Sequence, residues 1–124
     1  MSPLSLDSRQ LDGNVFVLSV AGEVDATNSD QLQSCLARLC GPGRRLVLDL
    51  SRLTFLDSSG LRVLLTAHAG LQQQGALLLA DVHDTPAHLL QVTGVWDALI
   101  IHPSVEQAIA AAQDGPTAPM REAP

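Results

Sequence analysis

Hydrophobic residues along this chain follow two spacings, and each spacing predicts a different kind of element. Leu4–Leu11 and Val15–Ala21 are short runs rich in strand-forming residues, and the Asp-Gly-Asn sequence between them tolerates positive φ angles. The chain is therefore expected to begin with an antiparallel hairpin. Arg45–Leu50 and Ala76–Asp81 are nearly continuous apolar runs, which are typical of parallel strands covered on both faces, and Ala98–Ile101 is expected to add a short last strand.

The first predicted helix has apolar residues at positions 32, 35, 36, 39 and 40, the spacing of one helical face. Its candidate N-caps are Thr27, Asn28 and Ser29. Asp30 and Gln31 follow the first two caps at capping-box distance, and a Gly-Pro pair ends the segment. This helix has the clearest periodicity, cap and stop signals of the chain.

Three more helices are predicted from the same spacing. One occupies residues 61–71, between the two buried strands, which gives a strand–helix–strand crossover. The next has Thr85 as its cap and Pro86 at its first position. The last begins with a capping box formed by Ser104 and Gln107.

The order of these elements predicts the α/β class. We expect one domain over residues 1–114, with an N-terminal hairpin, a mixed and mostly parallel sheet of about five strands, and about four helices. Residues 115–124 are too polar to join a core, so they are expected to form a disordered tail.

Charge and composition exclude several functional classes. The net charge is −6 and the seven basic residues are all arginines, with only Arg44 and Arg45 adjacent, so direct nucleic-acid binding is not expected. No apolar run approaches the roughly 20 residues that span a bilayer, and the N-terminus lacks a secretory signal pattern. The expected location is the cytoplasm, without membrane association.

Common enzyme and metal motifs are also missing from the sequence. A P-loop needs a lysine, and no serine has G-x-S-x-G spacing. Cys35 and Cys40 are too far apart on one helix to form a disulfide and the four histidines are scattered, so we expect core-filling cysteines, no metal and no cofactor. Asp49 resembles the phosphoacceptor of a response regulator, but the acidic pair and late lysine of that chemistry are missing, so it is expected to bond a neighbouring loop.

The segment TFLDSSGL, residues 54–61, stands where a buried strand gives way to a helix. Asp57 can accept hydrogen bonds from the free amides at the helix start. Ser58, Ser59 and Gly60 are poor helix formers, which indicates a purpose other than helix stability. A phosphoryl group on a serine there would be tolerated by the helix start and would change the surface by about −1.5 to −2 charges. The helical period directs Ser59 outward and places Ser58 at the edge of the apolar face.

Two stretches of the sequence resemble the STAS-domain family of anti-sigma factor antagonists. LVLDLSRLTFLDSSGLRVLL, at 46–65, resembles the phosphorylation motif of the family, and AGEVD, at 21–25, resembles an earlier family element in the loop after the second strand. The resemblance implies a non-enzymatic regulator whose unphosphorylated form binds an anti-sigma factor that is also a serine kinase, and thereby frees a sigma factor. It implies that Ser58 is the phosphoacceptor, that phosphorylation ends the binding, and that a serine phosphatase restores it.

The resemblance also implies an interface around Ser58 and around the earlier element. The partner contacts expected on this ground are Gly22, Glu23, Asp25, Asp57, Ser59, Gly60 and Leu61. The residues alone leave Ser59 open as the phosphoacceptor. They equally allow Gly22 to be a simple turn residue beside two solvated acids.

Two further expectations concern assembly. An alternative hypothesis is that the chain is a structural STAS subunit of a stress-signalling scaffold or of a lipid-transport complex. A weak homodimer could form through the edge of the leading hairpin, unless Asp7 and Arg9 blunt that edge.

Overall fold

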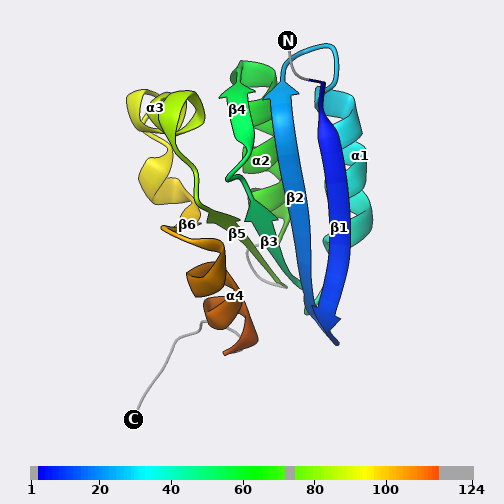
Figure 1. Ribbon diagram of the computed structural model, residues 1–124. Coiled ribbons are helices and arrows are strands. Elements are labelled where there is room, and N and C mark those ends of the chain that lie inside the picture. Colours follow the sequence, from blue (N-terminus) through cyan, green and yellow to red (C-terminus); the bar gives the residue numbers. More distant parts are fainter. Residues whose placement is uncertain (1–2, 72–74, 115–124) are drawn as a thin grey trace.

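The computed structural model describes residues 3–71 and 75–114, which form an α/β fold on one mixed sheet (Figure 1). Within these residues the strands are β1 (Ser5–Asp12), β2 (Val15–Val24), β3 (Arg45–Asp49), β4 (Leu53–Leu56), β5 (Ala76–Ala80) and β6 (Ile100–His102). The helices are α1 (Ser29–Leu39), α2 (Ser58–Leu71), α3 (Asp84–Val92) and α4 (Val105–Gln113), with a short 3₁₀ helix at Trp96–Ala98. The predicted hairpin, mostly parallel sheet and four helices are confirmed.

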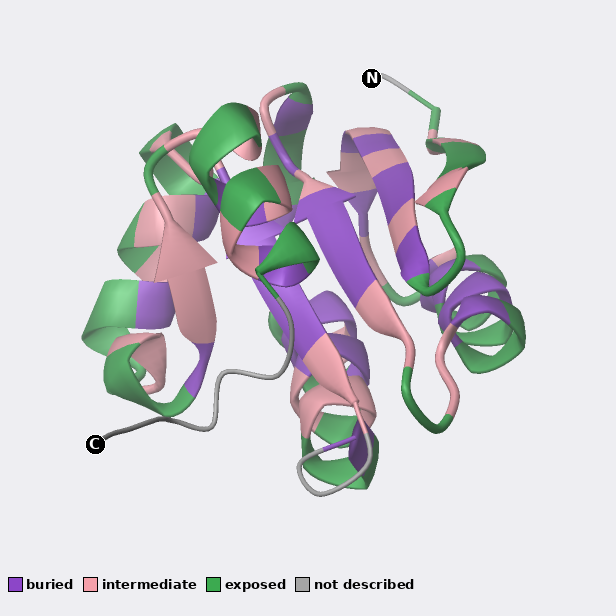
Figure 2. Ribbon diagram, turned by 90° about the horizontal axis from the view of Figure 1, so that it is seen from below, coloured by how far each residue is buried: buried purple, intermediate pink, exposed green. Residues whose placement is uncertain are grey.

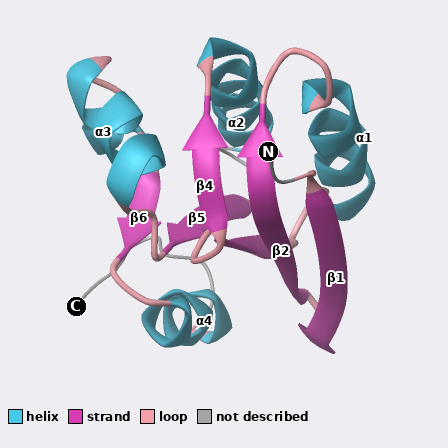
Figure 3. Ribbon diagram, turned by 45° about the horizontal axis from the view of Figure 1, so that its top comes forward, coloured by secondary structure: helices cyan, strands magenta, loops and turns pink. Residues whose placement is uncertain are grey.

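The sheet has the order β1-β2-β3-β5-β6, and β4 pairs with β2 outside this path. β1 and β2 are antiparallel, whereas all other strand pairs are parallel. Helices α1 and α2 lie on one side of the sheet and α4 lies on the other (Figure 3). Because both faces are covered, the middle residues of β3 and β5 are buried on every side, which explains their continuous apolar runs.

Strand β4 is the element that the sequence pattern does not reveal. It has four residues, and its two middle residues, Thr54 and Phe55, are exposed, so it shows neither an apolar run nor strand alternation. β4 pairs with the end of β2 across an irregularity at Gly22, whose φ of 95° is a conformation that favours glycine. β2 therefore extends to Val24, so Gly22 and Glu23 lie in a strand and not in the loop where the sequence analysis placed them.

The helix starts agree only in part with the predicted caps. The backbone N–H of Gln107 donates to Ser104 Oγ at 3.1 Å, which confirms Ser104 as the cap of α4. The predicted capping box of α1 is wrong, because Asn28 is the N-cap but its side chain bonds the preceding loop instead of α1. The predicted start of α3 is also wrong: His83 is its N-cap and Pro86 is its third residue. Proline is tolerated throughout the first turn of a helix, so it does not fix the start.

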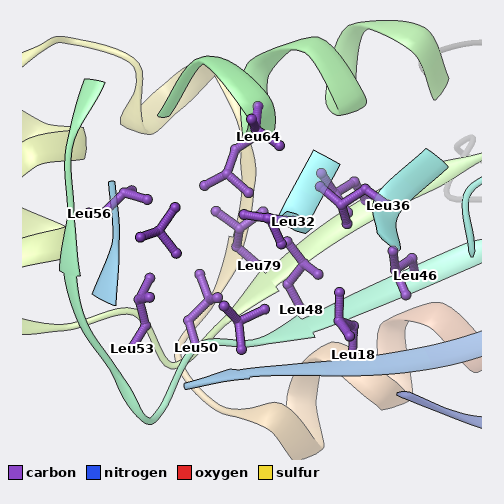
Figure 4. Close-up of a cluster of buried hydrophobic side chains, with 14 of the residues drawn as sticks. Leu18, Leu32, Leu36, Leu46, Leu48, Leu50, Leu53, Leu56, Leu64 and Leu79 are labelled. Atoms are coloured by element: carbon purple, nitrogen blue, oxygen red, sulfur yellow. The ribbon is translucent and has the colours of Figure 1, made fainter. Parts of the chain in front are cut away.

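Leucine side chains fill the main core, between the sheet and helices α1 and α2 (Figure 4). Leu36 of α1 and Leu64 of α2 point toward Leu48 of β3, and all three are almost completely buried. Cys35 is buried in this core and Cys40 is half-buried at the end of α1. Both cysteines are free, and Cys35 fills the core as predicted.

A smaller apolar cluster lies under α4, on the opposite face of the sheet. It joins Ala108 and Ala112 of α4 to Val17, Val47 and Leu78 of the strands. Buried residues accordingly concentrate in the central strands and on the inner faces of the helices (Figure 2).

Two expectations concern membrane-spanning helices and the C-terminal tail. Among the described residues, no helix has the length and apolar character needed to cross a membrane. The tail predicted at 115–124 lies outside the described residues.

Candidate functional site

The ends of β2 and β4 lie side by side at one edge of the sheet (Figures 1 and 3). Val24 pairs with Leu56, and the backbone N–H of Asp57 donates to the carbonyl of Val24 at 3.2 Å. Because the two strands are parallel, the loops that follow them leave the sheet at the same end. The pairing therefore joins the Asp25 loop to the start of α2, although the two segments are far apart in the sequence.

Asp57 caps helix α2. Its Oδ1 accepts hydrogen bonds from the backbone N–H of Ser59 at 2.9 Å and from that of Gly60 at 3.2 Å. Its carbonyl accepts the first intrahelical bond, from Leu61 N–H at 2.9 Å. The predicted cap is confirmed, and a cap of this kind stabilises the fold by about 1 kcal/mol.

Ser58 is the more accessible of the two serines. It is exposed as the first residue of α2, whereas Ser59 is half-buried and donates its backbone N–H to Asp57. The prediction from the helical period, with Ser59 outward and Ser58 at the edge, is therefore wrong. The buried face of α2 includes Gly60 and Val63, which the count from the leucines left out, and this turns Ser58 toward solvent.

Gly60 lets α2 approach β2 and β4 closely. A Cβ atom at this position would lie 2.3 Å from Leu56 Cδ1 and 2.8 Å from Val24 Cγ1, closer than side chains tolerate. Leu61 is also buried, at 8% exposure. Both residues belong to the packing beneath the site, so they can support a partner surface but offer it little accessible area.

A network of hydrogen bonds fixes the loop between β2 and α1. Asp25 Oδ1 accepts from the hydroxyl and from the backbone N–H of Thr27, at 2.5 and 2.9 Å. The hydroxyl bond is the main cause that lowers the pKa of Asp25, and the backbone bond adds to it, so this half-buried carboxylate stays ionised. Asn28 completes the loop, because its Oδ1 accepts from Asp25 N–H and its Nδ2 donates to the carbonyl of Glu23, both at 2.9 Å.

The remaining residues of the earlier element lie just before this loop. Gly22 is buried, its N–H donates to the carbonyl of Arg52, and its carbonyl accepts from Thr54 Oγ1, each at 3.0 Å. It therefore fastens β2 to β4 and is not a free turn. Glu23 is half-buried in the last part of β2. Of the predicted site residues, the acids Glu23, Asp25 and Asp57 thus share one end of the sheet with Ser58.

No group of three or more His, Cys, Asp or Glu side chains in residues 3–71 and 75–114 is arranged to hold a metal ion. The carboxylates of Asp25 and Asp57 already accept hydrogen bonds from backbone and hydroxyl groups, and the serine hydroxyls belong to the same site. Such a site can present negative charge and hydroxyl groups to another protein.

Comparison with known proteins settles the family. The model of the STAS domain matches residues 7–108, which include every residue of the site. BtrV of Bordetella bronchiseptica, described as an anti-sigma factor antagonist, is 34% identical over 110 residues, covering 87% of this chain and 94% of that protein. The chain belongs to the STAS-domain anti-sigma factor antagonist family.

Two other similar proteins agree with this assignment. The anti-sigma-B factor antagonist of Listeria monocytogenes is 30% identical over 100 residues, covering 79% of this chain and 88% of that protein. The crystal structure of an anti-sigma factor antagonist from Mycobacterium paratuberculosis has a TM-score of 0.82 and 25% identity, covering 90% of this chain and 96% of that chain. Members of this family are non-enzymatic regulators.

Asp49 of this STAS domain is a structural residue at the end of β3. Its Oδ1 accepts from the backbone N–H and the hydroxyl of Ser51, at 3.0 and 2.7 Å. Its Oδ2 accepts from Ser19 Oγ at 3.5 Å. The prediction that Asp49 bonds a neighbouring loop is confirmed.

Two exposed residues of this STAS domain near Ser58 were missed by the sequence analysis. Phe55 of β4 is 39% exposed, although most large hydrophobic side chains among the described residues are covered. Arg62 is exposed on α2, one turn after Ser58. Phe55 was missed because β4 was not recognised as a strand. The four-residue spacing of Ser58 and Arg62 was readable in the sequence.

Proposed function

We propose that this STAS protein antagonises an anti-sigma factor and that phosphorylation of Ser58 switches the interaction off. The observation that carries the proposal is the position of Ser58. It is the exposed first residue of α2, directly after the cap Asp57 and beside the Asp25 loop. The names of the relatives support the partner class, and the resemblance of the DSSG segment supports the modification.

The phosphoryl group would come from ATP on a partner that is both anti-sigma factor and serine kinase. Ser58 Oγ receives the group and loses its hydroxyl proton, so this protein is the substrate and contributes no catalytic group. A serine phosphatase would remove the group and restore binding.

The local fold tolerates this modification. The start of α2 presents backbone N–H groups and a partial positive charge, which favour a phosphate near the first turn. The phosphate adds about −1.5 to −2 charges to a surface that already carries Asp57, Asp25 and Glu23. A hundred- to thousandfold loss of affinity needs about 2.7 to 4 kcal/mol, which repulsion and desolvation at an interface can supply.

The partner surface would be divided into contact and support residues. Ser58, Ser59 and Asp57, together with Glu23 and Asp25 across the β2–β4 pair, have accessible side chains and make the contacts. Gly22, Gly60 and Leu61 are buried and hold the two loops in register.

The first test is retention of partners from native lysate on immobilised wild type, Ser58→Asp and Ser8→Asp. We expect wild type and Ser8→Asp to retain a serine kinase of the anti-sigma class and Ser58→Asp to lose it. Ser8→Asp is the matched control, because it makes the same substitution at an exposed serine of β1, opposite Leu18 and outside the proposed contact residues.

Two results would contradict the proposal. Equal retention of transporter or scaffold proteins by all three baits would favour the alternative hypothesis that the chain is a structural subunit. Phosphopeptide analysis of the native protein that finds phosphate only on Ser59 would move the switch to that residue.

A further inference from the structure

Arg62 stands one helical turn after Ser58 on the outward face of α2. Both residues are exposed, and the residues between them include the buried Gly60 and Leu61. Residues four apart on a helix have Cβ atoms about 5–6 Å apart, so these two side chains are neighbours on the surface. The long arginine side chain can reach a group attached to Ser58 Oγ.

The side chain of Arg62 is also uncommitted, whereas three of the other arginines form hydrogen bonds. Arg38 donates to Cys35 Sγ, Arg44 donates to the carbonyls that end α1, and Arg45 donates to the carbonyl of Ala112 in α4. Within the described part of the chain, Arg62 has neither a hydrogen bond nor an ion pair. Its guanidinium therefore loses no existing contact when it binds an anion.

We propose that Arg62 is the internal counter-ion of the phosphate on Ser58, so that phosphorylation draws this guanidinium over the first turn of α2. We call this ion pair between Arg62 and the phosphate the clamp. The inference rests on the proposed function only in taking Ser58 as the phosphoacceptor. It assigns a role to a residue that the proposed partner surface does not include.

The geometry favours this pair for two reasons. An acidic group placed four residues before a basic one is the favourable orientation on a helix, because each charge also faces the helix end that attracts it. A guanidinium can donate two parallel hydrogen bonds to phosphate oxygens, which a single ammonium cannot do in the same way.

The other charges around Ser58 make a counter-ion more important. Asp57 lies next to Ser58, and Asp25 and Glu23 come from the neighbouring β2–α1 loop and from β2. All three are acids, and Arg62 is the basic residue on the same helix face. The clamp would therefore offset part of the repulsion that the phosphate meets within this protein. It would also make the Arg62 cation less available to a partner, so the described charged groups around Ser58 that remain for contact are the acids.

The clamp can be measured without a partner protein. Phosphoserine is incorporated genetically at position 58 of the parent protein, Arg62→Gln, Arg62→Lys and Arg9→Gln. In each protein, ³¹P NMR titration measures how tightly the phosphate dianion binds a proton. We expect the phosphate to bind this proton about twofold more tightly in Arg62→Gln, because the dianion loses its counter-ion. Arg62→Lys should lie between the parent and Arg62→Gln, because it keeps the charge but loses the paired hydrogen bonds.

Arg9→Gln is the matched control for net charge. Arg9 is exposed on β1 opposite Val17, toward the other end of β2 from Val24, so its loss should leave the phosphate unchanged. Equal proton affinities in the parent and Arg62→Gln would overturn the clamp, as would an equal change in Arg9→Gln. If Arg62→Gln gives the expected change but phosphorylation does not weaken partner binding, the clamp stands and the proposed function fails.

Discussion

Single residues at the start of α2 have separate structural tasks. Asp57 satisfies two backbone N–H groups, Gly60 removes side-chain bulk where the helix meets β2 and β4, and Ser58 is left in solvent. Because the cap and the close packing hold the turn, the exposed serine can change its charge without the helix start losing its support.

Replacing Asp57 by Ala should reduce the free energy of unfolding by about 1 kcal/mol, because two N–H groups lose their acceptor. Asp57→Asn is the matched control, because its amide oxygen can cap the helix without the charge. Urea unfolding of the three proteins measures the difference. A loss in Asp57→Asn equal to that in Asp57→Ala would show that the charge, not the hydrogen bonds, stabilises the turn.

Gly60→Ala should destabilise the protein by about 1 kcal/mol, although Ala is the better helix former by about that amount. The new Cβ would overlap Leu56 and the stiff, fully buried Val24, and overpacking of this kind costs about 1–3 kcal/mol. Gly70 of the same helix is the control, because a Cβ there meets nothing within 4 Å. Gly70→Ala is therefore expected to stabilise, and thermal unfolding that moved both variants in the same direction would refute the packing argument.

At the scale of elements, the turn between β3 and β4 is tied to the start of α3 by a histidine. His83 Nε2 lies 2.8 Å from the carbonyl of Ser51 and Nδ1 lies 3.0 Å from Asp84 Oδ2. Both ring nitrogens face acceptors, so both can donate only when the imidazole is protonated. The bond to Ser51, followed by the bond to Asp84, raises the pKa of His83 above its usual 6.5.

This contact predicts a dependence of stability on pH. A pKa that is raised on folding adds stability that is fully present below pH 6.5 and is lost as the pH rises through the folded-state pKa. The free energy of unfolding should therefore fall as the pH rises above 6.5, and this fall should be smaller in His83→Gln. The effect should be modest, because the side chain of His83 is 42% exposed.

His88 provides the control for this experiment, because it is exposed on the same helix, α3. His88→Gln should keep the pH dependence of the parent when urea unfolding is repeated at each pH. An identical profile for His83→Gln and the parent would show that the Ser51 contact contributes nothing measurable.

At the scale of the whole molecule, the domain is organised by β2. This strand pairs with β1, with β3 through its first half and with β4 at its end, so it links the hairpin, the parallel sheet and the functional site. The site thus sits on the central sheet, and the phosphate proposed on Ser58 would act through surface charge without a rearrangement of the core.

The chain after Asp114 should be dispensable for this architecture. The family match ends at residue 108, and α4 ends at Gln113. A protein truncated after Asp114 should therefore keep the melting temperature of the full chain. A fall of more than about 4 °C, which corresponds to about 1 kcal/mol in a domain of this size, would contradict the prediction that 115–124 is a disordered tail.

The sequence by itself determined the elements with long periodic or continuous apolar patterns. Local rules predict the hairpin, the buried strands β3 and β5, the helix order and the Asp57 and Ser104 caps. Each of these features depends on residues that are close together in the sequence. The motif of the site was readable for the same reason.

Only the tertiary structure decided how these pieces meet. β4 is too short and too exposed to have a local pattern, and its pairing with β2 is what brings the Asp25 loop to Ser58. The exposure of Ser58 also depended on packing, because the face that α2 buries was set by the close approach of Gly60 to Leu56 and Val24. Such contacts join residues distant in the sequence, and no local spacing encodes them.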